Sequence, residues 1–145
     1  MEIRVISKIQ EFQELKSAWI SLFNSASYSV FQSFEFNYYS WEFELSKNPL
    51  NQLCVVLLKN SVDIFAIIPL YIDIKKRLRF INDDHADYCD FISTDEVKLL
   101  QVYSYLRLEF CFKSIILKNM KPTSNMYKLV KHLNFENKFV KIISE

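Results

Sequence analysis

LCVVLLKNSVDIFAIIPLYIDI, residues 53–74, contains two mainly apolar runs joined by a short polar turn. The first run, residues 53–58, carries no charged side chain, which is typical of a strand buried on both faces of a sheet. The second run, residues 62–74, predicts a longer strand. Pro69 lies inside it, and because proline has no N–H to donate, it indicates an edge, a bulge or a bend. These residues therefore predict the centre of a β-sheet.

Further strands surround this centre. The turn Lys75-Lys76-Arg77 follows it directly, and short β-type segments are expected at residues 2–6, 78–81, 88–92, 114–117 and 139–143. With four helices between them, the order of elements is β-α-α-β-β-β-(β)-α-β-α-β. This order predicts one mixed α/β (α+β) domain over residues 1–145.

Serine residues are the expected helix caps, because a serine hydroxyl can accept a bond from an unpaired backbone N–H at a helix start. Two pairs have the spacing of a capping box and two serines stand alone: Ser7 with Gln10, Ser93 with Glu96, Ser33 and Ser124. The first helix is expected to fade near residues 24–27, the second to run to about residue 45 and the third to about residue 112, while the fourth is short and carries apolar residues up to 133. Each carries apolar residues at helical spacing.

The second helix is unusually aromatic. Tyr38 and Trp41 belong to one apolar stripe, and Tyr39 and Phe43 belong to another. A helix with two such stripes is either buried on two sides or placed at an interface. These rings could also stack on sugar rings, although core packing is the commoner role of aromatic residues at this spacing.

The composition excludes several classes of protein. The net charge is +1 and the basic residues are dispersed, which argues against a nucleic-acid partner. The apolar runs are far shorter than the roughly 20 residues of a membrane span, and the N-terminus lacks the layout of a signal peptide. We therefore expect no membrane span and a cytoplasmic protein. Three cysteines without CxxC spacing predict free, buried thiols rather than disulfides or zinc ligands.

The chain of 145 residues contains no glycine. Its turns must form on Asn, Asp, Ser, Lys or Pro, as in the stretches at residues 47–49, 59–61 and 82–84. It also cannot build the usual glycine-rich loop that lets backbone N–H groups approach a cofactor phosphate.

Four short segments carry a family resemblance: LKSAWISL at 15–22, FQSFEF at 31–36, AIIPL at 66–70 and ADYCDF at 86–91. Together with the element order, they resemble the GNAT acetyltransferase superfamily. Within it, they look like the N-terminal half of the CelD-like proteins of polysaccharide biosynthesis, which are akin to the Fem-type peptidoglycan aminoacyltransferases. The resemblance implies a mixed, mostly antiparallel central sheet that is splayed and flanked by helices.

The resemblance also implies that the two halves of such a protein have different functions. Family members have two GNAT-like halves, and their acyl-donor chemistry is associated with the second half. This chain is similar to the first, degenerate half. The implied partners are a second GNAT-like domain or a second copy, and a sugar or peptidoglycan-precursor acceptor. Acetyl-CoA or another acyl donor is implied for the family only.

The loop expected to face that donor carries acidic residues. The family pattern Q/R-x-x-G-x-G/A corresponds here to residues 90–96, where Asp90, Asp95 and Glu96 occur. At about 5 Å each contact between like charges costs on the order of 1 kcal/mol. Asp95 and Glu96 would instead complement a helix dipole. We therefore expect no cofactor site in this chain and no binding of acetyl-CoA by this domain alone.

The segment NDDHADYCD, residues 82–90, is the densest polar cluster. His85 could act as a general base oriented by a carboxylate, or the cluster could bind a cation. Its spacing fits neither an EF-hand nor a zinc site, so no metal site is expected. The alternative is a solvated turn in which Asp87 or Asp90 caps backbone groups, the commoner role of these residues.

Substrate or interface candidates are Asp83, Asp84, Asp87, Tyr88 and Asp90 in this cluster, and Tyr38 and Trp41 in the second helix. Asp87, Tyr88 and Asp90 match the D-Y-x-D stretch of the resembled family, where they would orient the two halves or line an acceptor cleft. Three functions follow as expectations. The first is an accessory or acceptor-side domain of an acyl or aminoacyl transferase. The second is a non-catalytic interaction module, and the third a stand-alone N-acetyltransferase.

Overall fold

The computed structural model describes residues 1–133 and 140–143. In this part of the chain one sheet has seven strands, in the order β1-β2-β3-β4-β6-β7, with β5 paired to β3. The first pairings are antiparallel, and β4–β6 and β6–β7 are parallel. The strands are β1 Glu2–Ile6, β2 Gln52–Lys59, β3 Ile64–Ile72, β4 Arg77–Phe80, β5 Ile92–Ser93, β6 Ser114–Lys118 and β7 Val140–Ile143. Phe139, expected in the last strand, lies outside the described residues.

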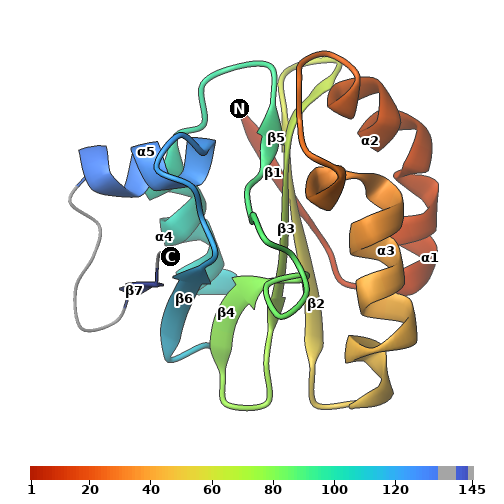
Figure 1. Cartoon of the computed structure of the whole chain (residues 1–145), viewed down its shortest axis with the longest axis vertical. Helices are drawn as coiled ribbons and strands as arrows, with labels where there is room; N and C mark the ends of the chain where they lie inside the picture. Colours follow the sequence, from red (N-terminus) through yellow and green to blue (C-terminus); the bar gives the residue numbers. More distant parts are fainter. Residues whose placement is uncertain (134–139, 144–145) are drawn as a thin grey trace.

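Helices cover both faces of the sheet (Figure 1). On one face lie α1 Ile9–Glu14, α2 Lys16–Phe23 and α3 Phe34–Phe43, and on the other lie α4 Leu99–Glu109 and α5 Asn125–His132. Short 3-10 turns occur at Val30–Gln32 (η1) and Leu45–Lys47 (η2). The predicted mixed α/β fold with a mostly antiparallel sheet flanked by helices is therefore confirmed. Among the described residues, none of these helices has the length and apolar character needed to cross a membrane.

Strand β2 is buried on both faces, as its apolar run predicted. Leu53, Val55 and Leu57 pack under α1–α3, while Cys54 and Val56 pack on the opposite side. Successive side chains of a strand point to opposite faces, so an uninterrupted apolar run needs cover on both.

Two of the predicted serine caps are confirmed, and the one at the start of the first helix is wrong. Ser33 accepts a bond from the N–H of Phe36, and Ser124 accepts one from Tyr127, so both single caps are confirmed. The capping box at Ser7 is wrong, because α1 starts after Lys8 without a side-chain cap. The first helix is also interrupted at residue 15, which separates α1 from α2.

Pro69 lies in a central strand, so the prediction of an edge is wrong. Strand β4 pairs with residues 70–72 of β3, and β5 pairs with residues 66–67. Both strands therefore lie along the same side of β3, one after the other, and β2 lies along its other side. Between β4 and β5 the chain leaves the sheet as residues 81–91, here named the acidic loop. The carbonyl of Pro69 accepts a bond from Ile81 at this gap. Its nitrogen faces the same gap, where the ladder needs no donor.

The segment after the acidic loop departs from two predictions. The strand expected at 88–92 is only Ile92–Ser93, and the helix expected from the Ser93–Glu96 capping box starts at Leu99, without a side-chain cap. Ile92 is 1% exposed and Val97 is 5% exposed. The segment therefore packs against the core instead of starting a helix.

Candidate functional site

The acidic loop is fixed from both sides of the molecule. On the side of η1, the Asn82 amide donates to the carbonyl of Phe31 at 2.6 Å. On the side of β6, the amide of Asn119 donates to the carbonyl of Asp83, and the N–H of Cys89 donates to the carbonyl of Asn119, both at 2.7 Å. These bonds give the loop one defined path between the two helical layers.

Arg79 of β4 pairs with two of the four aspartates of the loop. Its guanidinium makes a bidentate pair with Asp83, at 2.8 and 2.7 Å, and reaches Asp84 at 3.1 Å and Asp73 at 3.3 Å. Lys118 of β6 adds a second cation on Asp84 at 2.8 Å. Fork-like pairing of arginine with a carboxylate is a strong, directional contact. We name these five residues the Arg79 cluster.

Burial divides the cluster into an inner and an outer part. Asp83 is 1% exposed, and burial raises its pKa although Arg79 opposes this. Asp84 is half exposed, and the bond from Lys118 lowers its pKa. Burial alone would raise the pKa of Asp73, but the backbone N–H and the guanidinium of Arg77 outweigh it and lower that pKa. The carboxylates of this cluster are thus already paired with cations.

Asp90 caps a helix that lies far from it in the sequence. Its carboxylate accepts from the N–H groups of Phe91, Asn125 and Met126, each at 2.9 Å. The last two N–H groups belong to the start of α5, where a negative charge also complements the helix dipole. Burial raises the pKa of Asp90, and the three N–H groups offset this in part. Asp90 therefore does not face the segment before α4, contrary to the expected group of three acids there.

His85 points outward from the same loop. Its imidazole contacts the carboxylate of Glu44, at the C-terminal end of α3, and both side chains are 53% exposed. The expected pairing of His85 with a carboxylate is therefore present, but the carboxylate comes from α3 and not from the loop. Asp87 is also exposed.

Beside His85 lies an open hollow of about 480 Å³ along α3, here named the α3 groove. Residues four apart lie on one side of a helix, so Glu35, Tyr39 and Phe43 form one ridge of α3, and Phe36, Ser40 and Glu44 form the neighbouring one. The groove runs along these two ridges. It is lined by Val30, Ser33, Glu35, Phe36, Tyr39, Ser40, Phe43, Glu44 and His85. Tyr39 and Phe43 stack with ring centres 5.3 Å apart and are 51% and 58% exposed.

Tyr38 and Trp41 do not line this groove. Trp41 is 7% exposed and makes an edge contact with Tyr71 in the core. Tyr38 stacks on Phe34 and accepts a bond from Gln13. Tyr39 and Phe43 were predicted from the sequence as possible sugar-stacking rings of the second helix. The contribution of Glu35 and Glu44 to the groove was not predicted. The spacing 35, 39 and 43 was a usable signal.

Tyr88 borders a small polar hollow of about 160 Å³ next to Asp90 and the start of α5. The ammonium of Lys121 lies 3.5 Å from the centre of its ring, a cation–π contact. The Gln32 amide donates to the carbonyl of Tyr88 at 2.9 Å. Tyr88 thus joins η1 to the loop before α5.

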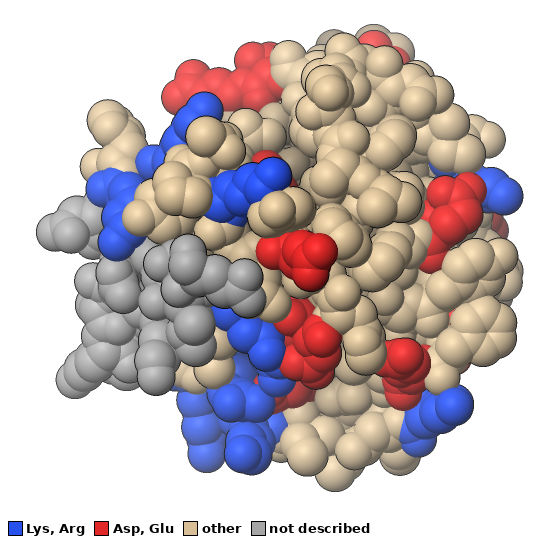
Figure 2. Space-filling view, viewed as in Figure 1, with Lys and Arg blue, Asp and Glu red and all other residues tan. Residues whose placement is uncertain are grey.

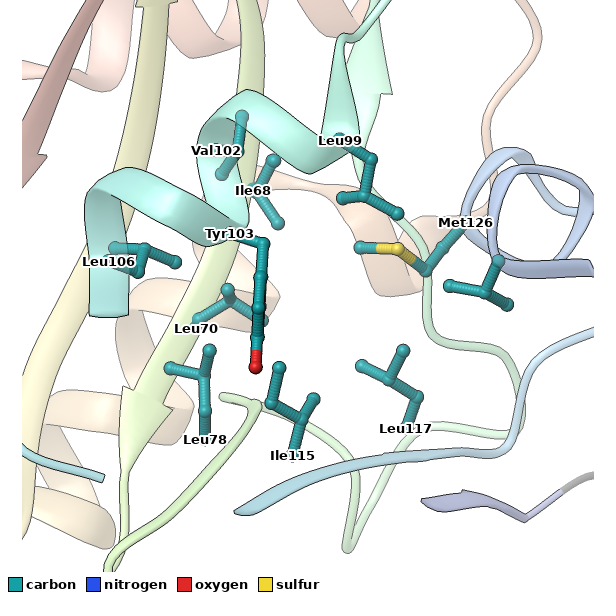
Figure 3. Close-up of a pocket in the computed structure, with 11 residues that line it drawn as sticks. Ile68, Leu70, Leu78, Leu99, Val102, Tyr103, Leu106, Ile115, Leu117 and Met126 are labelled. Carbon is teal, nitrogen blue, oxygen red and sulfur yellow. The ribbon is translucent and has the colours of Figure 1, made fainter. Parts of the chain in front are cut away.

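The space between the sheet and the helices α4 and α5 is filled by apolar side chains (Figure 3). Only about 40 Å³ remains in this space, and a separate open hollow of about 320 Å³ lies outside it, at the start of α4 and beside α5. The walls of the filled space are Ile68 and Leu70 of β3, Leu78 of β4 and residues of β6, α4 and α5. Figure 3 shows these side chains pointing toward one another across the space.

Among the described residues, no group of three or more His, Cys, Asp or Glu side chains is placed to hold a metal ion. The cysteines at 54, 89 and 111 are free thiols. The first two are buried as predicted, but Cys111 is exposed, so the prediction of burial is wrong for it. The chain matches no protein-family model, no curated protein and no solved structure.

Proposed function

We propose that this chain is an accessory, acceptor-side GNAT-like domain of an acyl or aminoacyl transferase in polysaccharide or cell-envelope biosynthesis, without an acyl-CoA site of its own. The resemblance of the four sequence segments and the order of elements support the relationship.

The filled space in Figure 3 is the observation that carries this proposal. An acyl-CoA bound in front of α4 needs a channel beside the sheet for its long pantetheine arm, and that arm needs polar partners. Ligand pockets commonly measure about 300–1,000 Å³. The 40 Å³ cavity is far smaller and is lined almost entirely by aliphatic side chains.

The segment before α4 gives a second, independent reason. Asp95 and Glu96 are exposed there, and the carboxylate of Asp95 accepts the N–H of Glu96 at 2.7 Å. A polyanion would meet two negative charges and a backbone donor that is already used. Asp90, which binds the start of α5, contributes nothing to this effect.

Titration with acetyl-CoA by isothermal calorimetry tests the proposal. We expect no measurable heat up to about 1 mM ligand, since the space beside the sheet is filled by apolar side chains and the exposed Asp95 and Glu96 repel a polyanion. The variant Asp95→Ser/Glu96→Ser serves as the matched control, because it removes the repulsion but leaves the cavity unchanged. It should also fail to bind. Micromolar affinity of the native chain would overturn the proposal.

The second candidate is a non-catalytic interaction module. It is favoured by the exposed, stacked rings of Tyr39 and Phe43 on the α3 groove, since apolar surface of this kind marks contact sites. A stand-alone N-acetyltransferase has the least support, because it needs the missing donor pocket. Free buried thiols support a reducing, cytoplasmic setting.

A further inference from the structure

The α3 groove is lined by two glutamates and, apart from the imidazole of His85 that contacts Glu44, by no basic side chain. From residue 17 to residue 46 the chain contains Glu35, Glu42 and Glu44 and no lysine or arginine, although the net charge of the chain is +1. Two of these glutamates line the groove together with the exposed rings of Tyr39 and Phe43. Aromatic faces and carboxylates together favour a cationic, partly apolar occupant.

The tip of the β3–β4 hairpin has the complementary character. Ile74 is 51% exposed, and Lys75 and Lys76 are exposed beside it. Asp73 fixes the shape of this turn, because its carboxylate accepts the N–H groups of Lys75 and Arg77, each at 2.9 Å.

The charge of these lysines is not neutralised within the tip. Asp73 is 4% exposed and is paired with Arg77 and Arg79, so it does not compensate Lys75 and Lys76. The exposed Lys113 joins them, since its N–H donates to the carbonyl of Lys76 at 2.7 Å. The tip is a projecting, basic and partly apolar feature.

Groove and tip lie on one face of the molecule. Figure 2 shows red acidic side chains in the middle and at the right, over the acidic loop and α3, and blue basic side chains at the lower left, where Figure 1 places the hairpin. A two-fold axis in the plane of such a face brings the acidic part of each copy opposite the basic part of the other.

We propose that the chain forms a two-fold homodimer in which the β3–β4 hairpin tip of each copy, Ile74 to Lys76, inserts into the α3 groove of the other. Glu35 and Glu44 then face Lys75 and Lys76 across both symmetric contacts. The stacked aromatic rings receive the side chain of Ile74. The inference does not depend on the donor-site proposal, because a monomeric chain would leave the absence of an acyl-CoA site untouched.

Light scattering coupled to size exclusion tests the dimer directly. We expect the native chain to be dimeric at about 100 µM in low salt and to dissociate toward monomer at about 0.5 M salt, as screening weakens exposed charge pairs. Two charge-reversal variants, Glu35→Lys/Glu44→Lys and Lys75→Glu/Lys76→Glu, should each be monomeric. The dissociation constant of each dimer should be at least about tenfold higher than that of the native chain. Lys8→Glu/Lys16→Glu, just before α1 and at the start of α2, is the matched control and should remain dimeric.

Mixing the two charge-reversal variants gives the sharpest result. In a mixed dimer, both contacts again pair a basic partner with an acidic one, so the mixture should regain the dimer that neither variant forms alone. The exchanged positions are exposed, and circular dichroism checks that each variant is folded. A native chain that stays monomeric in low salt would overturn the inference. Variants that dimerise as the native chain does, or a mixture that stays monomeric, would also overturn it.

Discussion

Asp83 and His85 are two residues apart in the acidic loop, yet they occupy opposite environments. Asp83 is 1% exposed and is held by the fork of Arg79, while His85 is half exposed and contacts Glu44 on the surface. The comparison teaches that a dense polar segment need not be one site. Here Asp83 supports the fold, and His85 lines a surface groove.

The largest expected effect comes from removing the cation of the inner region. Arg79→Ala leaves Asp83 buried without its partner, and breaking such a pair typically costs about 3–5 kcal/mol. Urea unfolding followed by circular dichroism measures the loss. Arg4→Ala is the control, because the Arg4–Glu11 pair is on the surface and should contribute less than about 1 kcal/mol. Equal losses in the two variants would contradict the buried role of Arg79.

The next effect concerns Asp90. In Asp90→Ala, the N–H groups of Asn125 and Met126 at the start of α5 lose their acceptor, which should cost about 1–2 kcal/mol of unfolding free energy. Asp95→Ala is the matched control, because that exposed carboxylate binds only the neighbouring N–H. It should change stability by less than about 0.5 kcal/mol. If Asp95→Ala lost more unfolding free energy than Asp90→Ala, Asp90 would not be a helix cap.

Acid should affect Asp84 in a defined direction. The bond from Lys118 lowers its pKa below the unfolded value of about 3.9. A lowered pKa adds stability above about pH 4, and this is lost as the pH falls through the folded-state pKa. Asp83 and Asp90 have raised pKa values and act in the opposite sense. Between about pH 5 and pH 2, Asp84→Asn should therefore lose less stability than the native chain in urea unfolding. A greater or equal loss would refute this.

The smallest effect is expected in the outer region. His85→Ala removes an exposed pair with Glu44, and such pairs contribute little, so the unfolding free energy should change by less than about 0.5 kcal/mol. Thermal unfolding at neutral pH measures this. A loss above about 2 kcal/mol would place His85 among the structural residues of the loop and remove the contrast with Asp83.

Much of the fold could be predicted from local patterns. The apolar run at residues 53–58 predicted a fully buried strand, and Ser33 and Ser124 were correct helix caps. The capping box at Ser93 failed, because burial of Ile92 and Val97 outweighs the local preference for a helix start. Of the edge, bulge or bend predicted at Pro69, the edge is wrong, because the gap beside β3 forms from separate strand segments and no local pattern shows it.

The candidate site was less predictable, because its partners come from elsewhere in the chain. The polar density of the acidic loop was visible, and a cap by Asp90 was among the alternatives. That Asp90 caps α5, that His85 meets Glu44 and that Lys118 reaches Asp84 depends on contacts over more than thirty residues. Arg79 and Asp83 are only four residues apart, but their pairing was not predicted either.

The central claim is that the buried carboxylate of Asp83 stabilises the fold through its pair with Arg79. A double-mutant cycle between these two residues tests this claim most directly. Asp83→Ala removes the charge that Arg79→Ala would leave unpaired. The double variant should therefore be at least about 2 kcal/mol more stable than the sum of the two single losses predicts. Losses that add within about 0.5 kcal/mol would show that the two side chains act independently, and would contradict the account.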